Sequence, residues 1–480
     1  MMRFAVPLLV IGLATGCAVG PDYGGPPAVE SVGTTAFDRA AMAPVATAQP
    51  VAEWWRQLDD PLLDDLIDRA FDHNRDIAAA RANLRASRAV LRGRGWDYFP
   101  TGGVDGSYAR QRFSEEAQQG GLPAGVDIPD RDFYDVGFDA IWEIDIFGRI
   151  GRANEAARAD AEAVGATRDD LLVSVAAEVA TAYVDLRGAQ QRLAVAERNA
   201  SNQEDSYALT QILLRGGRGT RLDTERARAQ LETTRASIPP LRAQIDALIH
   251  RLGVLTGNGP TGLRDALIDL RPLPELPRMV SIGDPSGLFR RRPDIRRAER
   301  ELAAATARIG VAAADFFPTV SIVGDAGFQS TAIGNLLQGS ALAFTFGPQL
   351  IWNLLDFGRI DAAVDAEGAR AEAAAARYEQ TVLLAFEETE NALTRYGNEL
   401  QRRDRLGQAQ RSAREAARLA RLRFDNGVDD FLTVLDAERV TLENEDRHVV
   451  SEIEVARQLI AIYKALGGGW QTVEEQARPD

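Results

Sequence analysis

Three short segments carry residue types that perform chemistry in other proteins. Asp356-Phe357-Gly358 matches the metal-binding motif of protein kinases, but no glycine-rich loop, catalytic-loop aspartate or nucleotide-binding lysine accompanies it. Residues 216–220 are rich in glycine but lack the Gly-Lys-Ser/Thr ending of a phosphate-binding loop. The arginines within residues 290–297 are typical of an ion-paired helix start. We therefore expect no catalytic site and no enzyme.

The composition excludes further kinds of site. Three histidines, four methionines and one cysteine leave little material for a transition-metal site, so we expect neither a metal nor a cofactor. The formal net charge of −15 argues against nucleic acid as a partner, because neutralising phosphates needs an excess of Lys and Arg. Beyond the N-terminus no apolar run is long enough to span a bilayer as a helix.

The one cysteine stands at the end of a signal-like segment. Arg3 gives a positive start, residues 4–13 are mostly apolar, and Ala14-Thr15-Gly16 leads with small residues into Cys17. This pattern is similar to a bacterial lipobox. It predicts an exported protein that is lipidated at Cys17 and anchored in the outer membrane.

The rest of the chain is an internal duplication. Residues 74–100 align with residues 292–318, and Phe147-Gly148-Arg149-Ile150 aligns with Phe357-Gly358-Arg359-Ile360. A repeat of this length indicates a duplicated domain. The expected boundaries are a signal peptide at 1–16, a lipidated linker at 17–60, a first repeat at 61–270, a second repeat at 271–470 and a C-terminal tail at 471–480.

Each repeat contains a segment whose apolar residues alternate with polar ones. This period of two predicts a β-hairpin at 101–143 and another at 319–353. Alternating strands usually cover a soluble core. Here aromatic residues dominate the apolar face, and the strands have the length needed to cross a bilayer at a tilt. We therefore expect lipid-facing positions at Phe138, Trp142, Phe344, Phe346 and Trp352.

Long helical patterns follow each hairpin. They lie within residues 149–255 and 359–466, each folding back at a glycine turn, and a shorter helix opens the second repeat at 293–316. Pro239-Pro240 is expected to break the first returning helix. Four amphipathic strands cannot close a barrel, and lipid does not tolerate open sheet edges. The chain is therefore expected to oligomerise, and three copies would supply twelve strands.

Several motifs together identify a resemblance. They are Trp54-Trp55, Asp60-Pro61-Leu62, Arg292-Pro293-Asp294-Ile295, Asp356-Phe357-Gly358-Arg359, Val434-Leu435-Asp436-Ala437 and Tyr463-Lys464-Ala465-Leu466-Gly467-Gly468-Gly469-Trp470. In this order they resemble TolC-type outer-membrane factors, and the start at Gly16-Cys17 resembles the lipoprotein branch that serves resistance-nodulation-division efflux pumps. The resemblance implies an α+β membrane protein: a homotrimer with a twelve-stranded outer-membrane β-barrel, continued by a long periplasmic α-helical barrel. It also implies a periplasmic membrane-fusion adaptor, an inner-membrane resistance-nodulation-division pump and outer-membrane lipid as partners.

The resemblance places a gate at the helix–turn–helix tips. Asp436 matches an aspartate that narrows the pore as a ring, where three copies would repel one another and attract cations. The alternative is an exposed acid near a helix start. Thr433 replaces the family's second tip aspartate. Asp223 matches a lock aspartate, but Asp429 and Phe424 stand where its arginine and tyrosine partners would be.

Two other functions compete with small-molecule efflux. One is a type I conduit that secretes proteins. The other is a periplasmic lipoprotein whose helices form a coiled-coil scaffold and that conducts nothing. The motif set and the expected lipidation favour an exit duct for small molecules and drugs.

Overall fold

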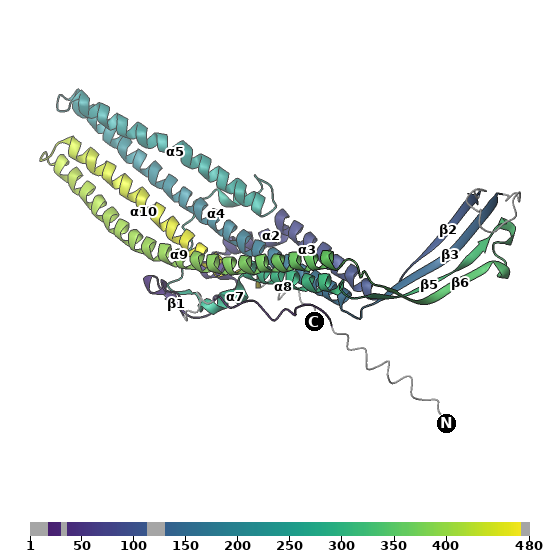
Figure 1. The fold of residues 1–480 in the computed structure, drawn as a ribbon. Helices are drawn as coiled ribbons and strands as arrows, with labels where there is room; N and C mark the ends of the chain where they lie inside the picture. Colours follow the sequence, from purple (N-terminus) through teal and green to yellow (C-terminus); the bar gives the residue numbers. More distant parts are fainter. Residues whose placement is uncertain (1–17, 30–35, 113–129, 472–480) are drawn as a thin grey trace. The chain divides into compact units, whose positions relative to one another are not determined.

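The fold is described from a computed structural model that covers residues 18–29, 36–112 and 130–471 (Figure 1). The chain divides into two compact units. One comprises residues 1–27, 85–163 and 298–377, and the other comprises residues 28–84, 164–297 and 378–480. The expected signal peptide at 1–16, Cys17 and nearly all of the expected tail lie outside the described residues.

The first unit contains one four-stranded antiparallel sheet in the order β2-β3-β5-β6. Its strands are β2 (Thr101–Gln111), β3 (Arg131–Ile144), β5 (Thr319–Ser330) and β6 (Leu342–Ile351). They lie where the alternation predicts the two hairpins, and pairing of β3 with β5 joins one hairpin to the other. Two short 3₁₀ turns, Ile333–Asn335 and Gly339–Ala341, lie between β5 and β6.

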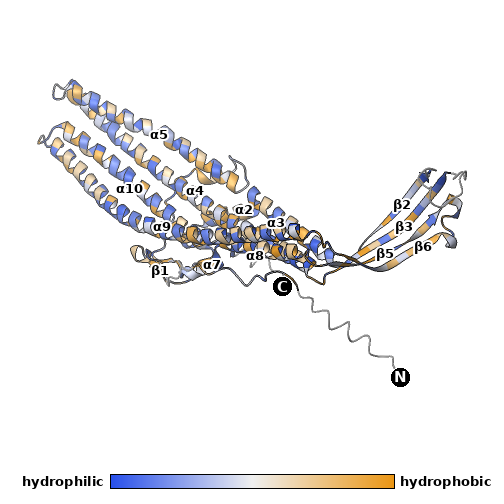
Figure 2. Ribbon diagram, in the orientation of Figure 1, coloured by the Kyte–Doolittle hydropathy of each residue, from blue (hydrophilic) through white to orange (hydrophobic). Residues whose placement is uncertain are grey.

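The register separates the two faces of this sheet. Directly paired residues in adjacent strands point to the same side. Phe138 pairs with Ala326, which in turn pairs with Phe344. On the opposite face Asp139 pairs with Asp325, which pairs with Thr345. The alternation of apolar and polar residues along the strands is visible in Figure 2.

Helices that pack through small residues complete the first unit. The helices α3 (Arg75–Gly95), α8 (Pro293–Ala314), α4 (Arg149–Arg215) and α9 (Phe357–Asp425) each contribute residues to both units. Within the first unit, Leu302 and Ala305 of α8 form a buried cluster with Ala371 and Ala374 of α9. Alanine at these contacts lets the helix backbones approach closely.

The second unit is built on two antiparallel helical hairpins (Figure 1). One pairs α4 with α5 (Arg221–Leu255), and the other pairs α9 with α10 (Phe431–Ala465). The helices α4 and α10 come very close, because a Cβ added at Gly188 would lie 2.2 Å from Cδ1 of Ile453. No helix among the described residues is both long and apolar enough to cross a membrane.

The prediction that Pro239-Pro240 breaks a helix is wrong. The helix α5 continues through both prolines. A proline removes one backbone hydrogen bond and crowds the preceding turn. Both prolines are exposed, so water can satisfy the carbonyl groups that lose their partners. Leu231, Thr234 and Leu241 keep one buried face across the proline pair. Packing of that face outweighs the local cost.

The remaining elements of the second unit are short, apart from α2 (Pro61–His73). They are η2 (Ala40–Met42), β1 (Val45–Ala46), η3 (Trp54–Leu58), α6 (Arg264–Leu267), β4 (Val280–Ser281), η6 (Pro285–Gly287) and α7 (Leu288–Arg291). Part of the expected linker is docked, because β1 pairs with β4 and both Trp54 and Trp55 are buried. Trp54 stacks on Tyr463 with ring centroids 5.0 Å apart.

Candidate functional site

The two helical hairpins turn in the same way. The helix α4 ends at Arg215 and α5 begins at Arg221, while α9 ends at Asp425 and α10 begins at Phe431. Gly217 has φ +72° and the equivalent Gly427 has φ +70°. This left-handed backbone is strained for any residue with a Cβ, so glycine at the turn explains how each helix can reverse within a few residues.

Side chains at the tips cap the returning helices. The hydroxyl of Thr220 accepts a hydrogen bond from the Asp223 amide at 3.2 Å, and the Asp223 carboxylate accepts one from the Thr220 amide at 3.2 Å. This is a capping box. In the second hairpin the Asp430 carboxylate accepts from the Thr433 amide at 3.1 Å. The structure therefore places Asp223 and Thr433 in local caps.

Asp429 and Phe424 also have partners within their own hairpin. Arg423 donates to Asp429 through two nitrogens, at 2.6 and 2.9 Å. These hydrogen bonds and the charge of Arg423 lower the pKa of Asp429. Phe424 contacts Phe431 edge to face, with ring centroids 5.2 Å apart. That pair adjoins a buried cluster formed by Ala227, Ala420, Phe431, Val434 and Leu435.

Asp436 lies on the first turns of α10. Its side chain is 64% exposed, and Oδ1 accepts a hydrogen bond from Arg439 at 2.8 Å. The hydrogen bond and the negative charge of Asp436 raise the pKa of Arg439. An exposed carboxylate with one arginine beside it can form part of a charged ring or remain a solvated helix acid.

The five sequence-predicted tip residues are therefore divided between two turns. Asp223 belongs to the first hairpin, whereas Phe424, Asp429, Thr433 and Asp436 belong to the second. Apolar contacts join the hairpins next to the tips, because Ala227 of α5 belongs to the cluster around Phe431. Sequence reasoning missed the arginine partners Arg423 and Arg439. The spacing of three residues between Asp436 and Arg439 is a detectable signal, since such pairs are neighbours on a helix.

Four of the five residues predicted to face lipid lie on one face of the sheet, and the fifth, Trp352, directly follows the last strand. Phe138 and Trp142 of β3 and Phe344 and Phe346 of β6 border an apolar hollow of about 610 Å³. The floor of this hollow consists of small residues, among them Ala140, Gly324 and Ala326. Phe346 is 76% exposed. In water such a surface would be costly, whereas contact with lipid would stabilise it.

Tryptophans are fixed where the strands end. The Trp142 indole nitrogen donates to the Tyr98 carbonyl at 2.9 Å, and the Trp352 indole nitrogen donates to the Phe316 carbonyl at 3.1 Å. The two contacts occupy equivalent places in the two repeats. Anchored indoles with one apolar side suit a membrane–water interface.

The segment that follows Cys17 is docked on the first unit. The Val19 amide donates to the Phe147 carbonyl at 3.1 Å, and the guanidinium of Arg152 contacts Asp22 at 2.5 Å. Cys17 itself lies outside the described residues. Its neighbour Ala18 lies against Gly148, just beyond the end of β3.

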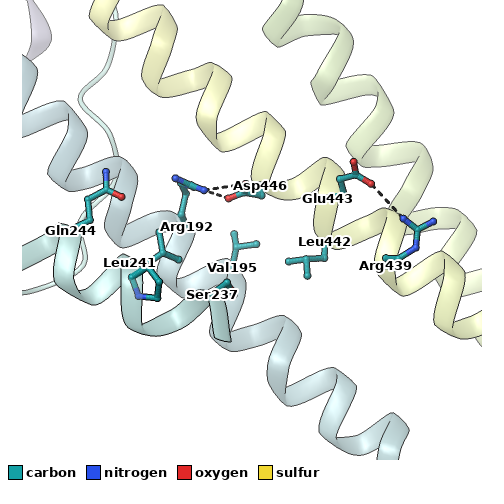
Figure 3. A pocket seen from close by; sticks show the side chains of 11 residues that line it. Arg192, Val195, Ser237, Leu241, Gln244, Arg439, Leu442, Glu443 and Asp446 are labelled. Carbon is teal, nitrogen blue, oxygen red and sulfur yellow. Dashed lines mark hydrogen bonds and ion pairs between the residues drawn. The ribbon is translucent and has the colours of Figure 1, made fainter. Parts of the chain in front are cut away.

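The second unit also has a hollow between α4, α5 and α10 (Figure 3). Its volume is about 610 Å³. Val195, Leu241 and Leu442 line it, while Arg192 and Asp446 form an ion pair of 2.7 Å at one side. The charged rim and apolar lining are ordinary for a groove between packed helices. No group of three or more potential metal ligands occurs among the described residues.

Comparison with known proteins identifies relatives of this chain. The family profile described as outer membrane efflux protein matches residues 66–258 and 285–468. The antibiotic efflux pump outer membrane protein ArpC of Pseudomonas putida is 32% identical, over 99% of this chain and 97% of that protein. The outer membrane protein OprJ of Pseudomonas aeruginosa is also 32% identical, over 97% of this chain and 96% of that protein.

Solved structures agree with the sequence comparison. The outer-membrane channel OprN is 41% identical and superposes with a TM-score of 0.87, covering 95% of this chain and 100% of that one. The open MtrE channel of Neisseria gonorrhoeae is 28% identical, with a TM-score of 0.81, covering 95% of this chain and 99% of that one. The fold is that of TolC-like outer-membrane channels, and the chain belongs to the outer membrane efflux protein family.

Proposed function

We propose that this protein is the outer-membrane exit duct of a tripartite efflux pump. The observation that carries the proposal is the sheet, with an aromatic face on one side and a polar face on the other, in a chain related to efflux-pump outer membrane proteins. The polar face would line a water-filled passage and the aromatic face would contact outer-membrane lipid.

The sheet edges support a homotrimer. Among the described residues of one chain, β2 and β6 each have a single neighbouring strand. Backbone groups left unpaired in lipid cost several kcal/mol each, so the edges must find partners. Three copies would close a barrel of twelve strands, and the helical hairpins would continue it as a periplasmic α-helical barrel.

The partners follow from the proposed duct. ArpC is named an antibiotic efflux pump protein, and TtgC of Pseudomonas putida a toluene efflux pump protein. We assign small molecules and drugs as the substrates of this chain. A periplasmic membrane-fusion adaptor and an inner-membrane resistance-nodulation-division pump would deliver them. The duct is passive, with no catalytic role.

The N-terminus and the tips complete the proposal. Residues 1–16 would be removed as a signal peptide, and Cys17 would carry the lipid at the start of the linker that extends to residue 60. The repeats at 61–270 and 271–470 would each supply one strand hairpin and one helical hairpin. Asp436 would form a threefold acidic ring at the periplasmic end, beside the caps and packing of Asp223, Thr433, Asp429 and Phe424.

Single-channel recording tests this function. Purified protein in a planar bilayer is expected to give discrete conductance steps that favour cations. A coiled-coil scaffold would give none. A type I protein conduit would conduct as well, so the second measurement is drug accumulation in cells that lack the gene. Loss of the gene should raise accumulation of small apolar drugs and leave protein secretion unchanged.

A further inference from the structure

A polar seam lies between the two helical hairpins. Four buried polar residues of α4 recur at spacings of four, three and four, namely Asn199, Gln203, Ser206 and Thr210. Such spacing places them on one stripe of the helix, where a coiled coil normally carries apolar residues. Asn199 contacts Glu445 and Ser206 contacts Glu438, two carboxylates on α10 that are seven residues apart.

The carboxylate of Glu445 is firmly held. It accepts hydrogen bonds from Asn199 at 3.0 Å and from Arg414 at 2.6 Å, and Arg198 lies 3.3 Å away. Burial alone would raise the pKa of Glu445, but the hydrogen bonds from Asn199 and Arg414 outweigh it and lower the pKa. In its charged form Glu445 therefore links α10 to α4 and to α9.

Glu438 lies seven residues before Glu445 on α10 and has weaker partners. The Ser206 hydroxyl donates to its carboxylate at 2.9 Å, and Arg421 of α9 lies 3.6 Å away. Arg421 also donates to the Ser206 oxygen at 3.1 Å and lies 3.9 Å from Asp425. The Glu438 side chain is only 19% exposed. Burial raises its pKa, against the lowering effects of Ser206 and Arg421.

A cavity gives Glu438 a second possible partner. The space measures about 270 Å³ and is bordered by Glu438, Gln203, Arg421 and Asp205. Gln203 is 2% exposed, and among the described residues neither its amide oxygen nor its amide nitrogen has a hydrogen-bond partner. An unpaired buried amide is unfavourable, because it has lost its hydrogen bonds to water and gained none in the protein. The site is polar and large enough to hold several waters.

We propose that Glu438 is a pH-responsive latch between the α4–α5 hairpin and the α9–α10 hairpin. In the charged state its carboxylate accepts from Ser206 and faces Arg421. In the protonated state its carboxyl group donates, directly or through water in the cavity, to the amide oxygen of Gln203, which gives that oxygen a partner. As a regulator of the duct, the latch rests on the proposed function.

The direction of the pH effect follows from linkage. Glu438 titrates at a higher pH when the hairpins are paired than when they separate and expose it. Between the pKa of the separated state and that of the paired state, the paired state therefore binds the proton more tightly than the separated state does. Lowering the pH through this window stabilises pairing, and raising the pH weakens it. Acid should close the duct.

The test compares two isosteric substitutions in the full-length trimer. Glu438→Gln fixes the neutral state, so its conductance should be low and should respond to pH less than wild type between about pH 8 and about pH 4, a range that brackets the usual Glu pKa of about 4.3. Wild-type conductance should fall on acidification. Glu415→Gln removes an exposed carboxylate of α9 that pairs with Arg418, and it should keep the wild-type pH response. The same response in Glu438→Gln as in wild type would overturn the latch.

Hydrogen exchange separates the latch from the duct. Amides of α4 around Gln203 should gain protection as the pH falls, after correction for the intrinsic exchange rate, and Glu438→Gln should lose this gain. That readout needs no ion flow. Absence of conductance with the exchange response intact would reject the duct alone, whereas conductance with a flat exchange response would reject the latch alone.

Discussion

Arginine substitutions at two neighbouring residues of β6 test the assignment of the sheet faces. Phe346 and Thr345 are both exposed in the single chain and lie near the centre of the ten-residue strand. The register puts them on opposite faces, since Phe346 pairs with Gly324 and Thr345 pairs with Asp325. Phe346→Arg would place a charge in lipid, while Thr345→Arg would place the same charge beside an acidic residue in the passage.

The expected cost differs strongly between the two substitutions. Arginine at the midplane of a transmembrane strand costs about 2–4 kcal/mol. Three copies in the proposed trimer would multiply this to about 6–12 kcal/mol per assembly. That sum is comparable to the entire folding free energy of a typical domain, about 5–15 kcal/mol. Thr345→Arg carries no lipid penalty, and Asp325 can pair with the new charge.

Membrane fractionation and denaturation measure the difference. Phe346→Arg should reduce the amount of trimer recovered from the outer membrane and lower its denaturation midpoint in guanidinium. Thr345→Arg should assemble normally and lower cation conductance. Equal tolerance of both substitutions would refute the lipid-facing assignment and favour a hairpin in water.

Three further changes test other parts of the proposal. Mass spectrometry of the mature N-terminus should show acylated Cys17, and Cys17→Ser should abolish the acyl mass while the strands still hold the trimer in the membrane; an unmodified mature N-terminus would contradict the anchor. Asp436→Ala should weaken cation selectivity and divalent-cation block with assembly unchanged, and unaltered selectivity would reduce Asp436 to a solvated helix acid. Arg423→Ala should return the lowered pKa of Asp429 toward its ordinary range, as followed by NMR titration. Because the pKa of Asp429 is lowered, the pair should stabilise the second turn fully above the ordinary Asp pKa and lose this effect as the pH falls from that value through the lowered pKa; a carboxylate that titrates identically in both proteins would exclude the ion pair.

Periodicity accounts for the elements that could be predicted. Alternation in β6 and helical spacing in α9 are properties of the chain itself, so the strands and helices lie close to the expected residues. The proline pair shows the limit of local signals. The tendency of a helix to break at Pro239 is a local preference. The face from Leu231 to Leu241 is buried by tertiary packing, and the periodicity of the sequence does not show how strongly that packing stabilises the helix.

The tip residues show a second limit. Carboxylates at a turn are visible in the sequence, but their partners depend on geometry. Asp223 could have bonded to a residue of another hairpin. It lies three residues after Thr220, however, and at that spacing it forms a capping box with Thr220. The buried row of Gln203 and Ser206 has helical spacing, but only the structure shows that α9 and α10 meet it with Arg421 and Glu438.

The duplication explains why the two tips share a backbone and differ in chemistry. Equivalent positions carry Thr220 and Asp223 in the first turn but Asp430 and Thr433 in the second. The hydroxyl and the carboxylate have exchanged places, and each pair still caps its helix. A threonine where the family has a tip aspartate is thus accompanied by an acid three residues earlier. The exposed positions diverge further, since Arg226 in the first repeat corresponds to Asp436 in the second. Glycine turns and caps restrict the backbone, whereas exposed side chains are free to change, so the acid proposed to select ions, Asp436, has an arginine at the equivalent position of the first hairpin.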